Sequence, residues 1–187
     1  MARCYSAPVP PRQTRLPDRW IVSDARNDAR LDAALAKADE PVGLIYRHYH
    51  LPPDERRARF DVLARIARSR GHVTVVSDSA RQARLWGAHG VYGPPGRLRP
   101  RAAGLLHLAT AHDLGEIALA NLLLADAVLL SPVFETRSHP GGPTLGPVRF
   151  RLLARHATCP VIALGGMTAA RARQLGWQRW AAIDGVP

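Results

Sequence analysis

The stretch V-I-A-L-G-G-M-T at residues 161–168 carries the pattern that decides the fold. Its apolar run, 161–165, is continuous rather than alternating, which is typical of a strand buried on both faces of a parallel sheet. Two glycines then allow a tight turn, and Thr168 can cap the helix that follows. The stretch therefore predicts one strand, turn and helix of an α/β protein.

The same unit recurs along the chain. Residues 54–70 place apolar side chains at intervals of three and four between arginines, which predicts an amphipathic helix. Asp113 and Glu116 have the spacing of a capping box that opens a helix through Leu124, and Pro147 suits the first position of another helix. Strands and helices are therefore expected to alternate. The apolar runs lie at 20–23, 42–46, 73–77, 90–92, 105–109, 127–131, 161–165 and 181–184.

Eight such strands can close into a (β/α)8 TIM barrel or form an open doubly wound sheet, and the repeat count favours a compact barrel. We expect an arm over residues 1–18 and one barrel domain over residues 19–187. The loop G-P-P-G-R-L-R-P-R at 93–101 and the stop at Pro187 predict that the fourth and last helices are reduced or missing. One face of the first and last strands would then be uncovered, unless the arm or a homodimer partner covers it.

Composition limits the class of protein. With 187 residues, of which 47% are apolar and 22% charged, the chain has the composition of one globular domain. Cys4 and Cys159 alone make neither a disulfide framework nor a zinc site. No secretion signal or membrane segment is visible, so we expect a cytoplasmic protein that does not enter a membrane.

The charge balance raises the question of a nucleic-acid partner. There are 26 Lys and Arg residues against 15 Asp and Glu, which gives a net charge of +11. This value fits a nucleic-acid binder. However, the arginines are spread along the predicted outer faces of helices, with no run of five like charges. A basic nucleic-acid-binding scaffold is therefore kept only as an alternative.

Candidate site residues follow the predicted strands, because barrels of this kind build their active sites at the carboxyl ends of the strands. Gly165 and Gly166 follow the seventh strand, where such barrels commonly bind phosphate, although a tight packing turn needs the same residues. The loop 131–146 has sixteen residues rich in Gly, Pro, Ser and Thr. That length indicates a lid or binding loop, the other interpretation being a flexible insertion.

Two motifs on this rim carry a resemblance to a known superfamily. They are S-P-V-F-E-T at 131–136 and A-L-G-G-M-T at 163–168, with weaker matches over residues 19–186. In these motifs the chain resembles the thiamine-phosphate synthase and thiazole tautomerase superfamily. The resemblance implies a (β/α)8 barrel of thiamine biosynthesis that couples hydroxymethylpyrimidine pyrophosphate to thiazole phosphate. It also implies that pyrophosphate is released and that Mg2+ assists its departure.

The resemblance further implies roles for individual residues. Arg47 matches the arginine that binds the pyrophosphate, and Asp78 matches an aspartate that helps hold the metal. A bidentate arginine, hydroxyl donors and a hard cation suit a departing pyrophosphate, on which negative charge develops. The expected catalytic residues are Arg47, Asp78, Thr110, Ser138 and His139, and the expected substrate-binding residues are Thr136, Gly165, Gly166 and Gly185.

The sequence also departs from the family pattern. Ile45 and Tyr49 replace the glutamine and lysine that flank the arginine, and a second metal-binding aspartate has no counterpart in G-V-Y-G-P-P-G at 90–96. Asp184 stands where the family has a small neutral residue beside phosphate, and the acid–base histidine of the tautomerase branch falls at Ser131. These departures motivate one alternative, a catalytically inactive or tautomerase-like relative that binds a phosphorylated thiamine precursor.

Overall fold

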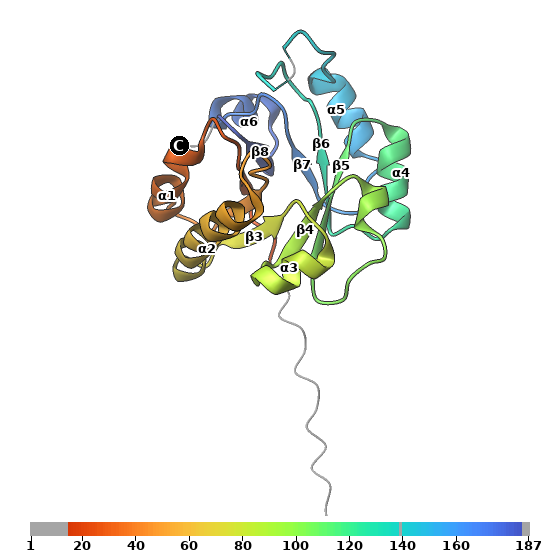
Figure 1. The fold of residues 1–187 in the computed structure, drawn as a ribbon. Helices are drawn as coiled ribbons and strands as arrows, with labels where there is room; N and C mark the ends of the chain where they lie inside the picture. Colours follow the sequence, from red (N-terminus) through yellow and green to blue (C-terminus); the bar gives the residue numbers. More distant parts are fainter. Residues whose placement is uncertain (1–14, 139, 185–187) are drawn as a thin grey trace, which may run out of the picture.

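A closed barrel of eight parallel strands forms the centre of the protein in the computed structural model, which describes residues 15–138 and 140–184 (Figure 1). The strands pair in chain order, and β8 pairs back with β1, so the predicted (β/α)8 barrel is confirmed. The strands are β1 (Arg19–Val22), β2 (Gly43–Tyr46), β3 (Val73–Val76), β4 (Gly90–Gly93), β5 (Leu106–Ala111), β6 (Ala127–Leu130), β7 (Val161–Ala163) and β8 (Trp180–Ala182).

Helices surround the barrel and connect successive strands (Figure 1). The fourth connection has only the 3-10 turn η1 (Pro95–Leu98), as its Gly- and Pro-rich sequence predicts. After β8 the described residues are Ile183 and Asp184, and they form no helix. None of the helices in the described ranges is long and apolar enough to cross a membrane. The helices are α1 (Asp28–Lys37), α2 (Pro53–Ser69), α3 (Ala80–Trp86), α4 (Leu114–Leu122), α5 (Gly146–Ala154) and α6 (Ala169–Leu175).

The predicted caps agree with the structure, but Pro147 is the second residue of α5 rather than its first. The Thr168 hydroxyl accepts a hydrogen bond from the N–H of Arg171 at 3.2 Å and so caps α6. Asp113 caps α4 in the same way through the N–H of Glu116, at 2.9 Å. The capping box is incomplete, because the Glu116 carboxylate accepts from the N–H of His112 at 2.7 Å rather than from that of Asp113.

Two apolar cores result from the alternation of side chains along the strands. One fills the barrel and includes Trp20, Ile45 and Leu129, and the other lies between the strands and the surrounding helices. Trp20 is 1% exposed, and its ring occupies the space beside Gly43 on the neighbouring strand. A Cβ atom on Gly43 would lie 2.1 Å from the Trp20 ring. The size of Trp20 therefore requires glycine at position 43.

We expect Gly43→Ala to lower the free energy of unfolding by about 1–3 kcal/mol, because the new methyl group overpacks the barrel interior. Gly96→Ala is the matched control, since a Cβ there meets no heavy atom within 4 Å. Denaturant unfolding of both variants measures the difference. Equal stability of the two variants would contradict the packing described for Trp20.

The outer face of β1 and β8 carries a small cavity of about 170 Å³. Trp180, Ile21 and Ala34 are among the residues that line it. Most of the predicted arm, residues 1–14, lies outside the described residues. Covering of this face by a homodimer partner stays a prediction.

Two histidines near the amino-terminal ends of β4 and β5, one half-buried and one buried, accept hydrogen bonds from neighbouring backbone. The Nδ1 atom of His89 accepts a hydrogen bond from the N–H of Thr74 at 3.0 Å, and Nε2 of His107 accepts from the N–H of Ala102 at 3.1 Å. Burial lowers the pKa of His89. Burial, with the nearby Arg101 charge, also lowers the pKa of His107. Both imidazoles are therefore held in the neutral form.

These histidines predict a loss of stability in mild acid. In the unfolded chain a histidine has its ordinary pKa of about 6.5. As the pH falls below that value the unfolded chain binds more protons than the folded protein, so the free energy of unfolding falls. Melting temperatures measured between pH 7.5 and 5.5 should show this decline. The double variant His89→Asn/His107→Gln keeps an acceptor at each position without a titrating ring, so its melting temperature should fall less steeply with pH. If its melting temperature falls as steeply as that of the unchanged protein, these two histidines do not cause the loss of stability.

Candidate active site at the carboxyl rim

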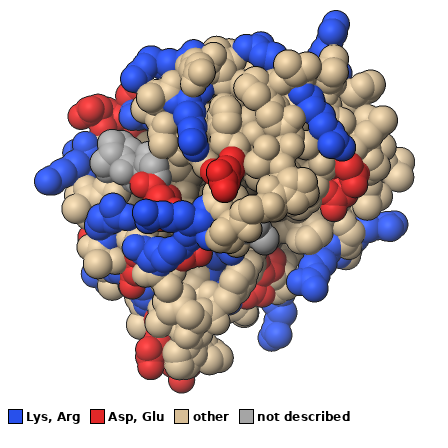
Figure 2. Space-filling view, turned by 90° about the horizontal axis from the view of Figure 1, so that it is seen from above, with Lys and Arg blue, Asp and Glu red and all other residues tan. Residues whose placement is uncertain are grey.

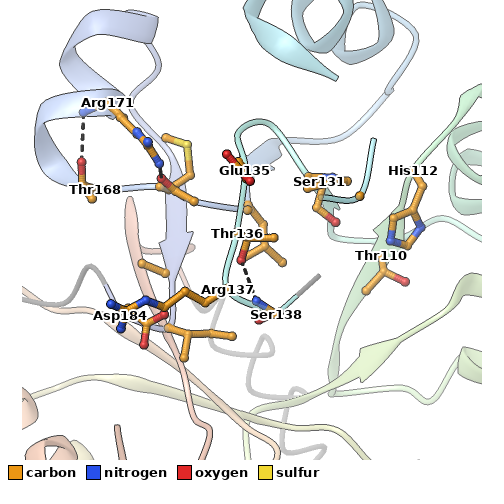
Figure 3. A pocket seen from close by; sticks show the side chains of 18 of the residues that line it. Thr110, His112, Ser131, Glu135, Thr136, Arg137, Ser138, Thr168, Arg171 and Asp184 are labelled. Carbon is orange, nitrogen blue, oxygen red and sulfur yellow. Dashed lines mark hydrogen bonds between the residues drawn. The ribbon is translucent and has the colours of Figure 1, made fainter. Parts of the chain in front are cut away.

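A cavity of about 560 Å³ opens at the carboxyl ends of the strands. Seen from above, arginine side chains gather around this face, with acidic side chains among them (Figure 2). Apolar side chains, including Leu164, Met167 and Ile183, form part of the cavity wall, while polar groups come from the loops that follow the strands (Figure 3). An apolar cavity with a few convergent polar groups is the usual form of a small-molecule site.

Six of the predicted site residues meet at this cavity, although they come from four different strand ends. Arg47 follows β2, Thr110 lies at the end of β5, and the loop after β6 brings two hydroxyl residues. Thr136 and Ser138 are joined within that loop, because the Thr136 hydroxyl accepts from the N–H of Ser138 at 3.3 Å (Figure 3). The six lining residues are Arg47, Thr110, Thr136, Ser138, Gly165 and Gly166.

Asp78 is not among the residues that line the cavity. Its Oδ2 atom accepts a hydrogen bond from Arg56 Nη1 at 2.8 Å, and its Oδ1 atom accepts from the N–H of Ser79 at 2.7 Å. Arg56 also donates from Nε to the carbonyl oxygen of Arg47 at 3.1 Å. In this arrangement Asp78 holds Arg56, and Arg56 supports the backbone that carries Arg47. The two remaining predicted residues, His139 and Gly185, lie outside the described residues.

The turn after β7 packs directly against the loop after β6. Gly165 and Gly166 have φ angles of 95° and 60°, in the region that favours glycine. A Cβ atom on Gly165 would lie 2.6 Å from Pro132 Cα, and one on Gly166 would lie 2.3 Å from the carbonyl oxygen of Glu135. Packing alone therefore requires both glycines, and the same close approach gives the cavity one wall of two adjoining segments.

A cluster around Arg26 fastens the loop after β6 to the opposite side of the rim. Arg26 donates from Nε to Asp24 Oδ1 at 2.9 Å, from Nη1 to Asp184 Oδ2 at 3.2 Å and from Nη2 to Ser138 Oγ at 2.9 Å. Burial disfavours ionisation of Asp24, but the hydrogen bonds from Arg26 outweigh it and hold the pKa of Asp24 below its usual value. The carboxylate of Asp184, which lines the cavity, is thus paired with a cation.

Sequence reasoning missed two arginines of the site. Arg171, on the first turn of α6, lines the cavity, and its guanidinium lies 5.1 Å from the centre of the Phe134 ring (Figure 3). Arg26 lies four residues after the end of β1, and Arg171 lies eight residues after the end of β7. In both cases the available signal was an arginine in the segment that follows a strand. Many other arginines in this chain fit that description, so the signal was weak.

Three arginines line the cavity, Arg47, Arg137 and Arg171, and Arg171 donates from Nη1 to the carbonyl oxygen of Gly166. Within the described ranges, neither Arg47 nor Arg171 has a carboxylate partner within ion-pair distance. They lie on different sides of the mouth, since Arg47 follows β2 and Arg171 follows β7. Burial raises the pKa of Tyr92, which also lines the cavity, to about 12, so this phenol stays neutral near pH 7.

The fold and the cavity together define a (β/α)8 barrel with its small-molecule site at the carboxyl rim. The family model described as thiamine monophosphate synthase matches residues 20–186. The chain therefore belongs to the thiamine monophosphate synthase family, as the rim motifs predicted.

One curated relative matches over part of its length. The chain is 37% identical over 59 residues to "Putative thiamine-phosphate synthase 2" of Aquifex aeolicus (strain VF5). The match covers 32% of this chain and 32% of that protein, so the chain matches about a third of the length of this relative.

Solved structures of low sequence identity share the fold. Thiamine phosphate pyrophosphorylase from Pyrococcus furiosus has a TM-score of 0.73 at 22% identity, with 89% of this chain and 85% of that chain covered. The enzyme of the same name from Bacteroides thetaiotaomicron has a TM-score of 0.58 at 13% identity, with 88% and 81% covered. The YdjI aldolase from Escherichia coli K12 has a TM-score of 0.64 at 12% identity, with 92% and 77% covered.

We expect Arg26→Ala to release the loop after β6, because the substitution removes the contacts to Ser138 and Asp184. Trypsin should then cleave after Arg137 several-fold faster than in the unchanged protein. Arg57→Ala is the matched control, since it removes a surface ion pair with Asp61 that does not touch the loop. Mass spectrometry of the early fragments measures the rate. The same rate in both variants would show that Arg26 does not fasten the loop.

Proposed function

We propose that this protein couples hydroxymethylpyrimidine pyrophosphate to thiazole phosphate and releases pyrophosphate. The observation that carries the proposal is the placement of Arg47 at the mouth of a cavity, without a carboxylate partner among the described residues and beside hydroxyl donors. Membership of the thiamine monophosphate synthase family supports the same reaction.

In this proposal Arg47 stabilises the departing pyrophosphate. The carbon–oxygen bond between the pyrimidine's methylene carbon and the pyrophosphate breaks, and the leaving group takes the electron pair and so gains negative charge. The lone pair of the thiazole ring nitrogen forms the new bond to that carbon. A guanidinium can donate two parallel hydrogen bonds to such an anion, in a cavity whose apolar wall reduces screening by water. Thr110, Thr136 and Ser138 line the same cavity and offer hydroxyl donors.

The thiazole phosphate is assigned to the other side of the mouth. The Gly165–Gly166 turn and Arg171 lie together after β7. A guanidinium beside this turn suits a phosphate, because it can donate two parallel hydrogen bonds to the anion. The apolar side chains of Leu164, Met167 and Ile183 would then face the rings of the two substrates.

The described residues do not form a Mg2+ site by themselves. No group of three His, Cys, Asp or Glu side chains within residues 15–138 and 140–184 is placed to hold a metal ion. Asp78, the predicted ligand, has both carboxylate oxygens engaged by Arg56 and Ser79. No step is therefore assigned to Mg2+ on this chain, and the prediction of Mg2+ now depends on oxygens that the substrate phosphates supply.

The hydrogen bonds that engage both carboxylate oxygens of Asp78 favour a second candidate function. In this function the protein binds a phosphorylated thiamine precursor without converting it to product. Such a protein would keep Arg47, Arg171 and the glycine turn as an anion-binding cavity. It would melt at a higher temperature in the presence of ligand, with a shift that rises with the logarithm of ligand concentration above the Kd, and would form no product.

The nucleic-acid alternative has less support. Several arginines outside the cavity are paired with carboxylates, among them Arg59 with Asp32 and Arg101 with Asp126. Such pairing leaves fewer free cations for a phosphate backbone, whose binding would weaken steeply with added salt. An absence of nucleic-acid binding at low salt removes this alternative.

We expect the protein to form thiamine phosphate from the two substrates in the presence of Mg2+, and Arg47→Ala to lower kcat/KM about a hundredfold because it removes charge stabilisation of the leaving group. Arg155→Ala, an exposed arginine that does not line the cavity, is the control and should keep full activity.

Product is followed by chromatography, and melting temperature is followed on the same samples. A thermal shift without product would replace the synthase proposal with the binding function. Turnover that survives Arg47→Ala would contradict the role assigned to that arginine.

A further inference from the structure

A chain of hydrogen bonds runs behind Arg47, on the side away from the cavity. The N–H of Arg47 donates to the hydroxyl of Ser23 at 2.7 Å. Ser23 Oγ lies 2.8 Å from Nδ1 of His48, and Nε2 of His48 lies 2.8 Å from Oδ1 of Asp28. Ser23 follows β1 and Asp28 begins α1, so the Ser23–His48–Asp28 chain links the ends of three elements at the rim.

The direction of each hydrogen bond follows from counting donors. The Arg47 N–H occupies one lone pair of the Ser23 oxygen, so the Ser23 hydroxyl is free to donate to Nδ1 of His48. The hydrogen of the neutral ring then lies on Nε2 and is donated to the Asp28 carboxylate. Every polar atom of the buried chain is satisfied in this arrangement.

Serine, histidine and aspartate in hydrogen-bonded series also occur in nucleophilic active sites. Here Ser23 is fully buried and His48 is 1% exposed, and neither lines the cavity. A substrate therefore has no access to the Ser23 oxygen. The Ser23–His48–Asp28 series instead holds the backbone of Arg47, and Arg47 lines the cavity.

The backbone at His48 is itself unusual. Its φ angle is 32°, a positive value that few residues other than glycine adopt and that costs about 1 kcal/mol or more. The ring stacks on Tyr46 with centroids 4.7 Å apart. Together with the two hydrogen bonds of the ring, this packing offsets the backbone cost. The polypeptide backbone thus makes a sharp turn of defined conformation immediately after Arg47.

The far end of the hydrogen-bonded chain is held by α2. Arg59 Nε donates to Oδ1 of Asp28 at 2.7 Å, and Arg59 also pairs with Asp32. The groups around the His48 ring are Asp28, Arg59, Tyr46 and His50. Burial lowers the pKa of His48, although Asp28 opposes the shift, so the ring is neutral near pH 7.

We propose that Ser23, His48 and Asp28 are positioning residues that fix the direction of Arg47 toward an anionic ligand in the rim cavity. The backbone of Arg47 is held on both sides, its N–H by Ser23 and its carbonyl oxygen by Arg56. A guanidinium on such a fixed support loses less freedom when it binds a pyrophosphate. The inference rests on the proposed function only in taking Arg47 as the pyrophosphate ligand.

Calorimetric titration with inorganic pyrophosphate tests the inference in a double-mutant cycle of Ser23→Ala and Arg47→Ala. Arg47→Ala should raise the Kd about tenfold or more, and Ser23→Ala about threefold to tenfold. In the double variant the Kd should equal that of Arg47→Ala alone, because Ser23 acts only through Arg47.

Thr74→Val is the matched control. Like Ser23, Thr74 is buried and its hydroxyl contacts a histidine, His89, but Thr74 lies at the amino-terminal end of β3, away from the rim. It should leave the Kd unchanged. Asp28→Ala provides a second test if Ser23→Ala folds poorly, since the Asp28 side chain is partly exposed. Asp28→Ala should raise the Kd in a protein that keeps Arg47, and it should not raise the Kd further in the Arg47→Ala variant.

Each outcome separates the inference from the function on which it rests. If Arg47→Ala weakens binding while Ser23→Ala and Asp28→Ala do not, the positioning role is wrong and the proposed function stands. If the effects of Ser23→Ala and Arg47→Ala simply add, Ser23 does not act through Arg47. If Arg47→Ala leaves the Kd unchanged, the role of Arg47 in the proposed function fails, and the inference fails with it.

Discussion

Closure of the sheet between β1 and β8 is the constraint on which the rest of the structure depends. Three residue pairs make this contact, with Trp20 opposite Ala181 at its centre. Because all eight strands run parallel, closure brings all their carboxyl ends onto one rim. Closure also creates the barrel interior in which Trp20 packs. The Trp20 ring in turn requires glycine at position 43. Without closure, the ends of β2 and β7 would not border one cavity.

Arginine–carboxylate pairs organise this rim. Arg26 neutralises Asp184, which would otherwise repel a phosphate in the cavity, and Arg56 occupies Asp78. An aspartate that looks like a metal ligand in the sequence is thus used to hold an arginine, which supports the backbone of Arg47. The charges that remain for a ligand are those of arginines without carboxylate partners among the described residues. This distribution is the basis for proposing that the cavity binds phosphorylated molecules.

The glycine turn after β7 shows how a packing requirement and a binding requirement can coincide. The two glycines are needed because the loop after β6 lies against them. The space that their side chains would occupy is taken by Pro132 and Glu135, and the two packed segments together line the cavity. The packing requirement follows from the structure, and phosphate binding at this turn stays a prediction. The packing of the two segments builds the wall that a phosphate would meet.

The sequence by itself determined the eight strands, the reduced fourth helix, the caps at Asp113 and Thr168, and the family. These features depend on residues close together in the chain, through periodicity, backbone preference and local hydrogen bonds. Tertiary structure alone decided the pairing of Arg26 with Asp184, 158 positions apart, and the contact of Ser23 with His48, 25 positions apart. Whether a polar side chain faces a ligand or a neighbouring charge depends on which loops barrel closure brings together, and no local pattern encodes that.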